Sequence, residues 1–210
     1  MATRFIAILG MAVLVGGCAI GQEYDYSKVQ TNLEAQTDKD VAVSVVDQRQ
    51  YVVSGDKKPN FVGLQRAGFG IPYDVTTQSG QPLARQMNTA VVNALQDQDI
   101  TAEALVLTPG TDTDEALERF QEGASDRFLL VDVKEWKTDV YARMTTHWDL
   151  VASVYDQSGT RLAQNSISGV EPVSASALGL EDPNSQKATQ LTSRKLEELL
   201  NDPNIQSALN

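Results

Sequence analysis

The sequence predicts an α/β (α+β) fold, a two-layer sandwich in which helices cover a mixed β-sheet. Runs of β-branched and apolar residues, the first of them Val41–Val46, are typical of buried strands. Between these runs, apolar residues recur at helical spacing, as they do after Pro82. In the second half of the chain, strand patterns follow one another across a short turn, which predicts an antiparallel meander within the sheet.

The first strand is followed by a stretch with little regularity. Tyr51–Thr77 contains scattered glycines and two prolines, and its only clear strand signal is the short apolar run Phe61–Leu64. Gly68-Phe69-Gly70 could suggest a phosphate-binding loop, but neither a lysine nor a strand-to-helix context accompanies it. We therefore interpret these three residues as a turn.

Two helices and a strand are predicted in the middle of the chain. The first helix begins at Pro82, since proline is well suited to a first helical turn. Its apolar side consists of Leu83, Met87, Ala90, Val91, Ala94 and Leu95. A strand over Ile100–Leu107 follows. Asp112 and Glu115 then have the spacing of a capping box, which opens a second helix that ends at Gly123.

The C-terminal part predicts three antiparallel strands and a closing helix. Phe128–Val131 begins a central strand, and the residues around Trp148 alternate as a second strand with one buried face. Asp156–Gly159 supplies the hairpin turn to a third strand, Thr160–Gly169. A helix over 188–200 follows, and Asp202-Pro203 begins a short last turn.

The N-terminus has the pattern of an export signal. Arg4 precedes the apolar stretch Phe5–Val15, which is much shorter than the roughly 20 residues that a membrane-spanning helix needs. This stretch runs into Val15-Gly16-Gly17-Cys18, which resembles the lipobox of bacterial lipoproteins. The resemblance implies cleavage between Gly17 and Cys18, and a diacylglyceryl group with further acylation, such as palmitate, on Cys18.

Several acyl chains anchor a protein stably, whereas one chain does so only marginally. Ala19 occupies the position where lipoproteins retained in the inner membrane commonly have aspartate, so we expect the outer membrane with the domain facing the periplasm. The alternative is an ordinary secretory signal in which Cys18 is merely a small apolar residue. Cys18 is the only cysteine, so the exported domain has no internal disulfide.

The charge of the chain bears on its partners. Removing residues 1–17 takes away one of the 17 basic residues and none of the 28 acidic ones, so the formal charge becomes −12. Nucleic acid is therefore not an expected partner, since its recognition requires a basic face. An anionic lipid surface would also repel such a domain, so the acyl chains at Cys18 have to hold it at the membrane.

The expected domains are a signal peptide over 1–17, a flexible lipid-anchored tether over 18–39 and a single α/β domain over 40–210. The tether is rich in polar residues and lacks a sustained apolar period. Tyr24 and Tyr26 could instead pack back on the domain, and the sequence does not decide between these two arrangements.

The sequence contains few residues in arrangements that are typical of catalytic or metal-binding sites, so we expect no enzyme, no cofactor and no metal site. His147 is the only histidine and lies in a predicted strand, where a structural role is the simpler interpretation. Asp112, Asp114 and Glu115 lack the glycine and ligand spacing of a calcium-binding loop, and helix capping accounts for them.

Four residues are candidates for contact with a protein partner. Asp47 and Arg49 lie two positions apart, and could form a bidentate ion pair that fixes a loop or could belong to a docking surface. Trp136 and Tyr141 are expected at the outward end of a strand, where aromatic side chains would suit an interface. On this interpretation, Trp136→Ala would leave folding intact and abolish co-purification with the partner.

The chain resembles the YajG-type family of uncharacterised outer-membrane lipoproteins. The resembling features are Val15–Cys18, the first strand running into Asp47-Gln48-Arg49, the helix from Pro82, Phe128–Trp136 and the hairpin about Asp156–Gly159. The chain is more loosely similar to curli-secretion and lipopolysaccharide-assembly lipoproteins and to the amino-terminal domain of TolB. The resemblance implies a lipid-anchored, non-enzymatic accessory or scaffold in outer-membrane assembly, transport or a surface machine. The alternatives are a binding protein for a lipid or small hydrophobic ligand, which would need an apolar cavity, and an envelope hydrolase that would depend on His147.

Overall fold

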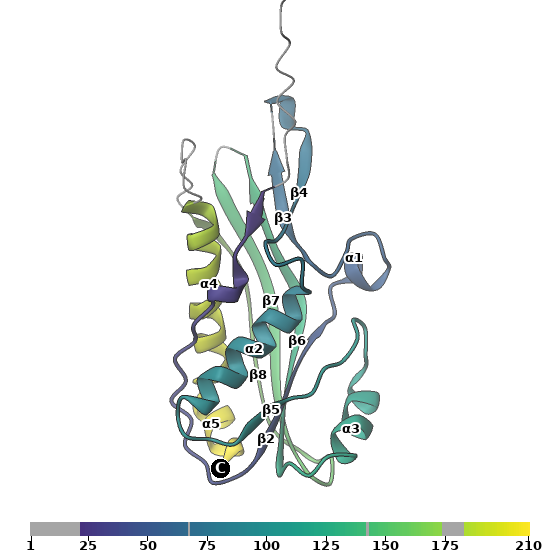
Figure 1. Cartoon of the computed structure of the whole chain (residues 1–210), viewed down its shortest axis with the longest axis vertical. Helices are drawn as coiled ribbons and strands as arrows, with labels where there is room; N and C mark the ends of the chain where they lie inside the picture. Colours follow the sequence, from purple (N-terminus) through teal and green to yellow (C-terminus); the bar gives the residue numbers. More distant parts are fainter. Residues whose placement is uncertain (1–21, 67, 142, 174–182) are drawn as a thin grey trace, which may run out of the picture.

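A computed structural model of the chain describes residues 22–66, 68–141, 143–173 and 183–210, which form a curled mixed sheet with helices packed against it (Figure 1). The strands are β1 Glu23–Tyr24, β2 Val41–Asp47, β3 Phe61–Arg66, β4 Pro72–Thr77, β5 Ala102–Ala104, β6 Arg127–Val140, β7 Met144–Asp156 and β8 Arg161–Val173. The helices are α1 Gln50–Val53, α2 Leu83–Gln96, α3 Thr113–Gln121, α4 Pro183–Leu200 and α5 Pro203–Leu209, with short 3₁₀ turns η1 Tyr26–Lys28 and η2 Gly68–Gly70. This confirms the predicted fold class.

The long strand β6 organises the sheet. On one side it pairs antiparallel with β7, which pairs antiparallel with β8, and this confirms the predicted meander. On the other side two parallel strands share its edge: β2 pairs with the first half as far as Val133, and β3 pairs with Thr138–Val140. β5 extends the sheet beyond β2, and β4 and β1 extend it beyond β3.

The main core lies between one face of the sheet and helices α2, α4 and α5 (Figure 1). Val41, Val43 and Val45 of β2 face this core, as do Leu129 and Val131 of β6. The intervening residues of these strands face the other way and pack against α3 in a second, smaller cluster of Ala42, Val46, Ala116, Phe120, Phe128, Leu130 and Tyr155. Coverage on both faces explains why most of β2 and the segment Phe128–Val131 of β6 are apolar at successive positions instead of alternating.

Helix ends and turns follow the predicted local chemistry. Asp112 caps α3 by accepting a hydrogen bond from the Glu115 backbone N–H at 2.9 Å, and Asp202 caps α5 in the same way through Asn204. Gly159 adopts a φ of 81° in the turn between β7 and β8, as the hairpin prediction requires.

Two parts of the sheet differ from the prediction. The strand expected over 100–107 is only Ala102–Ala104, and the sequence analysis did not predict β4. β4 begins with Pro72 and lies near the edge of the sheet. Among the described strands, the two-residue β1 is the one that lies outside it, and the polar sequence of β4 carries no apolar alternation.

The segment expected to be a flexible tether is packed where the structure describes it, so that prediction is wrong for residues 22–39. Tyr24, Tyr26, Val29 and Leu33 are buried in the main core. Side chains of α4 bind its backbone: Glu197 accepts a hydrogen bond from the Asn32 N–H at 2.9 Å. The tyrosines therefore pack back on the domain, which begins no later than residue 22 instead of at residue 40. Gly17 and Cys18 lie outside the described residues.

None of the helices within the described ranges combines the length and the apolar character needed to cross a membrane.

Candidate functional site

The Asp47–Arg49 pair forms at the C-terminal end of β2. Arg49 Nε donates to Asp47 Oδ1 at 2.7 Å and Nη2 donates to Oδ2 at 2.5 Å, so the bidentate geometry is as predicted. The side chains are only 0% and 2% exposed. Burial opposes the charge on Arg49, but the hydrogen-bonded carboxylate outweighs it and raises the pKa of the guanidinium above its ordinary value.

β2 pairs with the first part of one edge of β6, and β3 pairs with the last part of the same edge. The Asp47–Arg49 pair fills the gap between them. Arg49 Nη1 donates to the carbonyl of Trp136 at 3.2 Å, in that gap, and to the carbonyl of Phe61 at 2.7 Å. Tyr51 donates its hydroxyl to Glu135 at 2.5 Å and to the same Trp136 carbonyl at 3.2 Å. Because the guanidinium supplies the hydrogen bonds that a neighbouring strand would otherwise make, Asp47 and Arg49 have a structural role. Their burial means that they do not belong to an exposed docking surface.

Trp136 is fully buried, so the prediction that it lies on a docking surface is also wrong. Its indole N–H donates to the Tyr26 hydroxyl at 3.0 Å. The cause is a β-bulge between Val133 and Glu135. Before the bulge, odd-numbered residues such as Val131 and Val133 face the main core; after it, the core-facing residues are even-numbered. A residue inserted in this way moves every later side chain of the strand to the opposite face of the sheet. The pattern of apolar residues in the sequence gives no sign of the insertion.

Tyr141 is the one predicted docking residue that reaches the surface. It is 64% exposed and directly follows β6. Since β3 pairs in parallel with the end of β6, with Gln65 opposite Val140, the turn that follows β3 lies at the same end of the sheet as Tyr141. That turn carries Phe69, which is fully exposed, and Ile71, which is 52% exposed. We call Phe69, Ile71 and Tyr141 the apical tip.

Gly68-Phe69-Gly70 was predicted only as a turn. A signal was present, because a turn has no structural need for an aromatic side chain between two glycines. In the structure, Phe69 adopts a φ of 62°, in the left-handed region that residues other than Gly, Asn and Asp rarely occupy.

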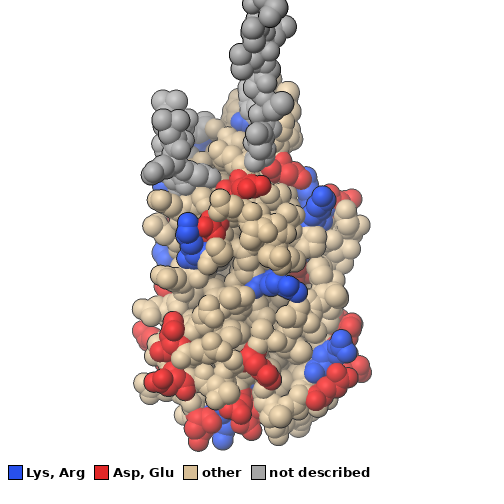
Figure 2. Space-filling model, in the orientation of Figure 1, with Lys and Arg blue, Asp and Glu red and all other residues tan. Residues whose placement is uncertain are grey.

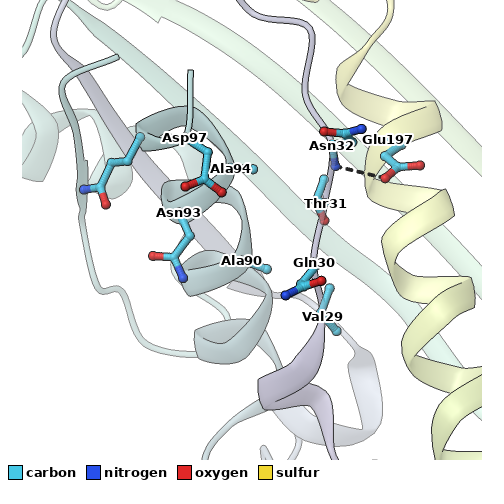
Figure 3. A pocket seen from close by; sticks show the side chains of 10 residues that line it. Val29, Gln30, Thr31, Asn32, Ala90, Asn93, Ala94, Asp97 and Glu197 are labelled. Carbon is cyan, nitrogen blue, oxygen red and sulfur yellow. Dashed lines mark hydrogen bonds between the residues drawn. The ribbon is translucent and has the colours of Figure 1, made fainter. Parts of the chain in front are cut away.

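A polar groove lies between α2, the segment 29–32 and α4 (Figure 3). Its volume is about 670 Å³, and Figure 3 shows Asn93 and Asp97 on one side and Gln30 and Glu197 on the other. The Asn32–Glu197 hydrogen bond joins the segment 29–32 to α4 within one side of the groove, opposite α2. Such a groove can hydrogen-bond water or a polar segment, but it offers little apolar surface.

The space between the sheet and α2 tests the lipid-binding alternative. The cavity there, which includes Val45, Ala84 and Leu107 in its lining, has a volume of about 70 Å³. Ligand pockets usually measure about 300–1,000 Å³. An acyl chain does not fit this cavity. A second cavity, of about 380 Å³, lies on the outer side of α2 beside Val29, Gln86 and Ala90, and its volume is within the range of ligand pockets.

The ionisable groups considered in the sequence analysis are dispersed. His147 lies on β7 opposite Lys137, and no hydrogen bond joins its side chain to another described residue. Asp132 accepts a hydrogen bond from Gln48 at 3.5 Å, and burial raises the pKa of its carboxyl. Within the ranges that the structure describes, no group of three or more His, Cys, Asp or Glu side chains could hold a metal ion.

By sequence, the chain matches no protein-family description and no curated protein. By structure, it is similar to protein XCC0632 from Xanthomonas campestris, of family DUF330, with 15% identity, a TM-score of 0.53, and coverage of 86% of this chain and 92% of that one. This similarity shows a shared fold.

Two further structures are similar at a lower level. The PelC dodecamer from Paraburkholderia phytofirmans has 18% identity, a TM-score of 0.40, and coverage of 80% of this chain and 91% of that one. Lipoprotein GNA1162 from Neisseria meningitidis has 15% identity, a TM-score of 0.31, and coverage of 78% and 99%. With TM-scores below 0.5, these two carry no argument about this chain.

Proposed function

We propose that this chain is a lipid-anchored lipoprotein of the outer membrane that acts without enzymatic activity, as an accessory or scaffold in envelope assembly, transport or a surface machine. One observation carries the proposal: an apolar stretch too short to span a bilayer leads into Val15-Gly16-Gly17-Cys18. The resemblance to YajG-type lipoproteins supports the same role.

The domain itself fits a protein that presents a surface. Its core consists of packed apolar side chains, and the buried ion pair between Asp47 and Arg49 joins strands through the carbonyls of Phe61 and Trp136. We therefore expect a protein partner in the envelope, with the acyl chains at Cys18 as the attachment to the membrane.

Cys18→Ser tests the anchor. Both the unsubstituted protein and the variant would be expressed with the full signal sequence, fractionated into membrane and periplasmic pools, and analysed by mass spectrometry of the N-terminal peptide. We expect acylated Cys18 in the outer-membrane pool for the unsubstituted protein. The variant should move out of that pool because no acyl chain can be attached.

In-cell crosslinking of the same two strains tests the partner. A protein crosslinked to the unsubstituted chain but lost with Cys18→Ser would identify the pathway. An unmodified N-terminus produced by cleavage elsewhere, with the protein released to the periplasm, would instead establish an ordinary secretory signal and refute the proposal.

A further inference from the structure

The chain enters the described structure near the apical tip. β1 runs parallel to β4, with Glu23 opposite Thr76, and β4 runs away from the tip after Pro72. Figure 1 shows the start of β1 beside the hairpin of β3 and β4, with the C-terminus and the start of β2 at the other end of the molecule. The chain therefore enters β1 from the side of the apical tip.

The hairpin of β3 and β4 extends beyond Glu23 by about the length of the chain that connects Glu23 to Cys18. Four residues separate Thr76 from Pro72, so β4 rises roughly 13 Å above the level of Glu23, and the turn that carries Phe69 lies farther out. Cys18 precedes Glu23 by five residues, which span at most roughly 17 Å when fully extended. Acyl chains on Cys18 therefore cannot hold the membrane far beyond Phe69.

The side chains at the apical tip suit the boundary between lipid and water. Phe69 is fully exposed, Tyr141 is 64% exposed, and Ile71 adds an aliphatic side chain that is 52% exposed. Aromatic and apolar side chains on exposed loops are favoured where headgroups meet acyl chains. At the base of the tip, Arg66 pairs with Asp139 through two hydrogen bonds of 2.8 and 2.5 Å, so that this aspartate presents no unpaired negative charge to a membrane.

The backbone at Phe69 also argues that this side chain is not present for stability. A left-handed conformation is unfavourable for phenylalanine, and the side chain gains no burial in return because it is fully exposed. Glycine or asparagine would form this turn more easily. A lipid interface would provide the apolar environment that the ring lacks within this chain.

A membrane contact at the apical tip requires that acidic side chains lie mainly away from the tip. Asp40 and Asp126 lie at the starts of β2 and β6, at the end of the sheet opposite the apical tip. On the face shown in Figure 2, the hairpin at the top carries few charged side chains, and most of the red side chains lie in the lower half. An anionic lipid surface would repel that lower end and leave the tip as the end that approaches it.

From these observations we infer that the apical tip inserts into the lipid interface of the membrane that holds the acyl chains. The occupant of this surface is lipid, and contact at two points, Cys18 and the tip, fixes the orientation of the domain. This inference rests on the proposed function, because it takes acylated Cys18 as the first point of contact.

Tryptophan placed at the tip tests the insertion. The full-length acylated Phe69→Trp protein would be reconstituted into phosphatidylethanolamine–phosphatidylglycerol vesicles, with or without phospholipid brominated on its acyl chains. Bromine quenches tryptophan emission only at short range, so we expect loss of more than about half of the added fluorescence, together with a blue shift. The native Trp136 and Trp148 are 0% and 8% exposed, and their emission is subtracted using the unsubstituted protein.

The matched control is Leu162→Trp, because Leu162 is 43% exposed but lies near the start of β8, at the opposite end of the sheet. It should show neither quenching nor a blue shift. Ile71→Trp serves as a second reporter at the tip and should resemble Phe69→Trp.

Flotation of the vesicles separates the two proposals. Protein that does not float with the lipid contradicts the proposed anchor. Protein that floats while Phe69→Trp and Ile71→Trp are quenched no more than Leu162→Trp leaves the anchor intact and refutes insertion. Shielding of Phe69→Trp from iodide in native outer membranes, but not in vesicles of lipid alone, would assign the tip to a protein partner and also refute insertion.

Discussion

Replacement of Arg49 by methionine should strongly destabilise the domain. Methionine fills much of the space of the arginine side chain but supplies no hydrogen-bond donor. The Asp47 carboxylate, 2% exposed, would then be buried without its partner, and the carbonyl of Phe61 would lose a 2.7 Å hydrogen bond. The Trp136 carbonyl would keep only the hydroxyl of Tyr51.

The size of the effect follows from this burial. Breaking a buried ion pair by removing one partner costs about 3–5 kcal/mol, chiefly because one charge remains uncompensated. For a domain of this size, a loss of about 4 kcal/mol lowers the melting temperature by about 8–16 °C. Urea unfolding followed by circular dichroism gives the free energy of unfolding, and a thermal scan gives the melting temperature.

The chain contains its own control. Arg66 and Asp139 form a second bidentate pair, but their side chains are 35% and 25% exposed, so water can solvate either group after the other is removed. Arg66→Met should cost only a small fraction of what Arg49→Met costs. Adding Asp47→Asn to Arg49→Met should recover stability by removing the buried charge. Equal losses for the two arginine variants would refute the reasoning.

Three further predictions concern the main core and β3. Burial raises the pKa of the Tyr26 hydroxyl to about 12 from 10.0. Between these two pH values the unfolded state loses the hydroxyl proton while the folded state keeps it. The free energy of unfolding is therefore unaffected by this group below pH 10 and falls by about 1.4 kcal/mol per pH unit toward pH 12. Tyr26→Phe should flatten that decline in urea unfolding at pH 9–11, and an unchanged slope would contradict the assignment. Trp136→Ala should lower the free energy of unfolding by about 3–5 kcal/mol, against less than about 0.5 for the exposed Tyr141→Ala, and similar melting temperatures would show that burial has been misjudged. Gly63→Ala would place a methyl group against the hydroxyl and carbonyl of Thr138, so hydrogen exchange should accelerate selectively in β3; uniform exchange would refute this.

The helices and strands that were predicted correctly from the sequence are those that pack against a single neighbouring layer of the structure. Helix α2 has one apolar side against one sheet face, and β7 alternates because its outer face is partly solvated. The Asp112 cap and the Gly159 turn depend only on local geometry, and both were predicted. For such elements, local chemistry and tertiary packing favour the same structure.

The parts that could not be predicted depend on residues far away in the chain. The inward orientation of Trp136 results from a bulge whose position is set by pairing with β7. Tyr24 and Leu33 show no period because the backbone around them is held by α4 and by β4, not by its own regular structure. For the candidate site, the position of Tyr141 at the outward end of a predicted strand indicated that it is exposed. Its place at the same end of the sheet as Phe69 depends on the pairing of β3 with β6.

The packing of the N-terminal segment against the C-terminal helices has a consequence for the order of folding. The Asn32 N–H binds Glu197, and Thr37 donates its hydroxyl to the carbonyl of Leu209, across 165 and 172 residues respectively. Contacts of such sequence separation form late because a long loop has to close first. A ribosome has to finish almost the whole chain before residues 30–37 can find their native neighbours, so the earliest part of the domain to be synthesised is among the last to become ordered.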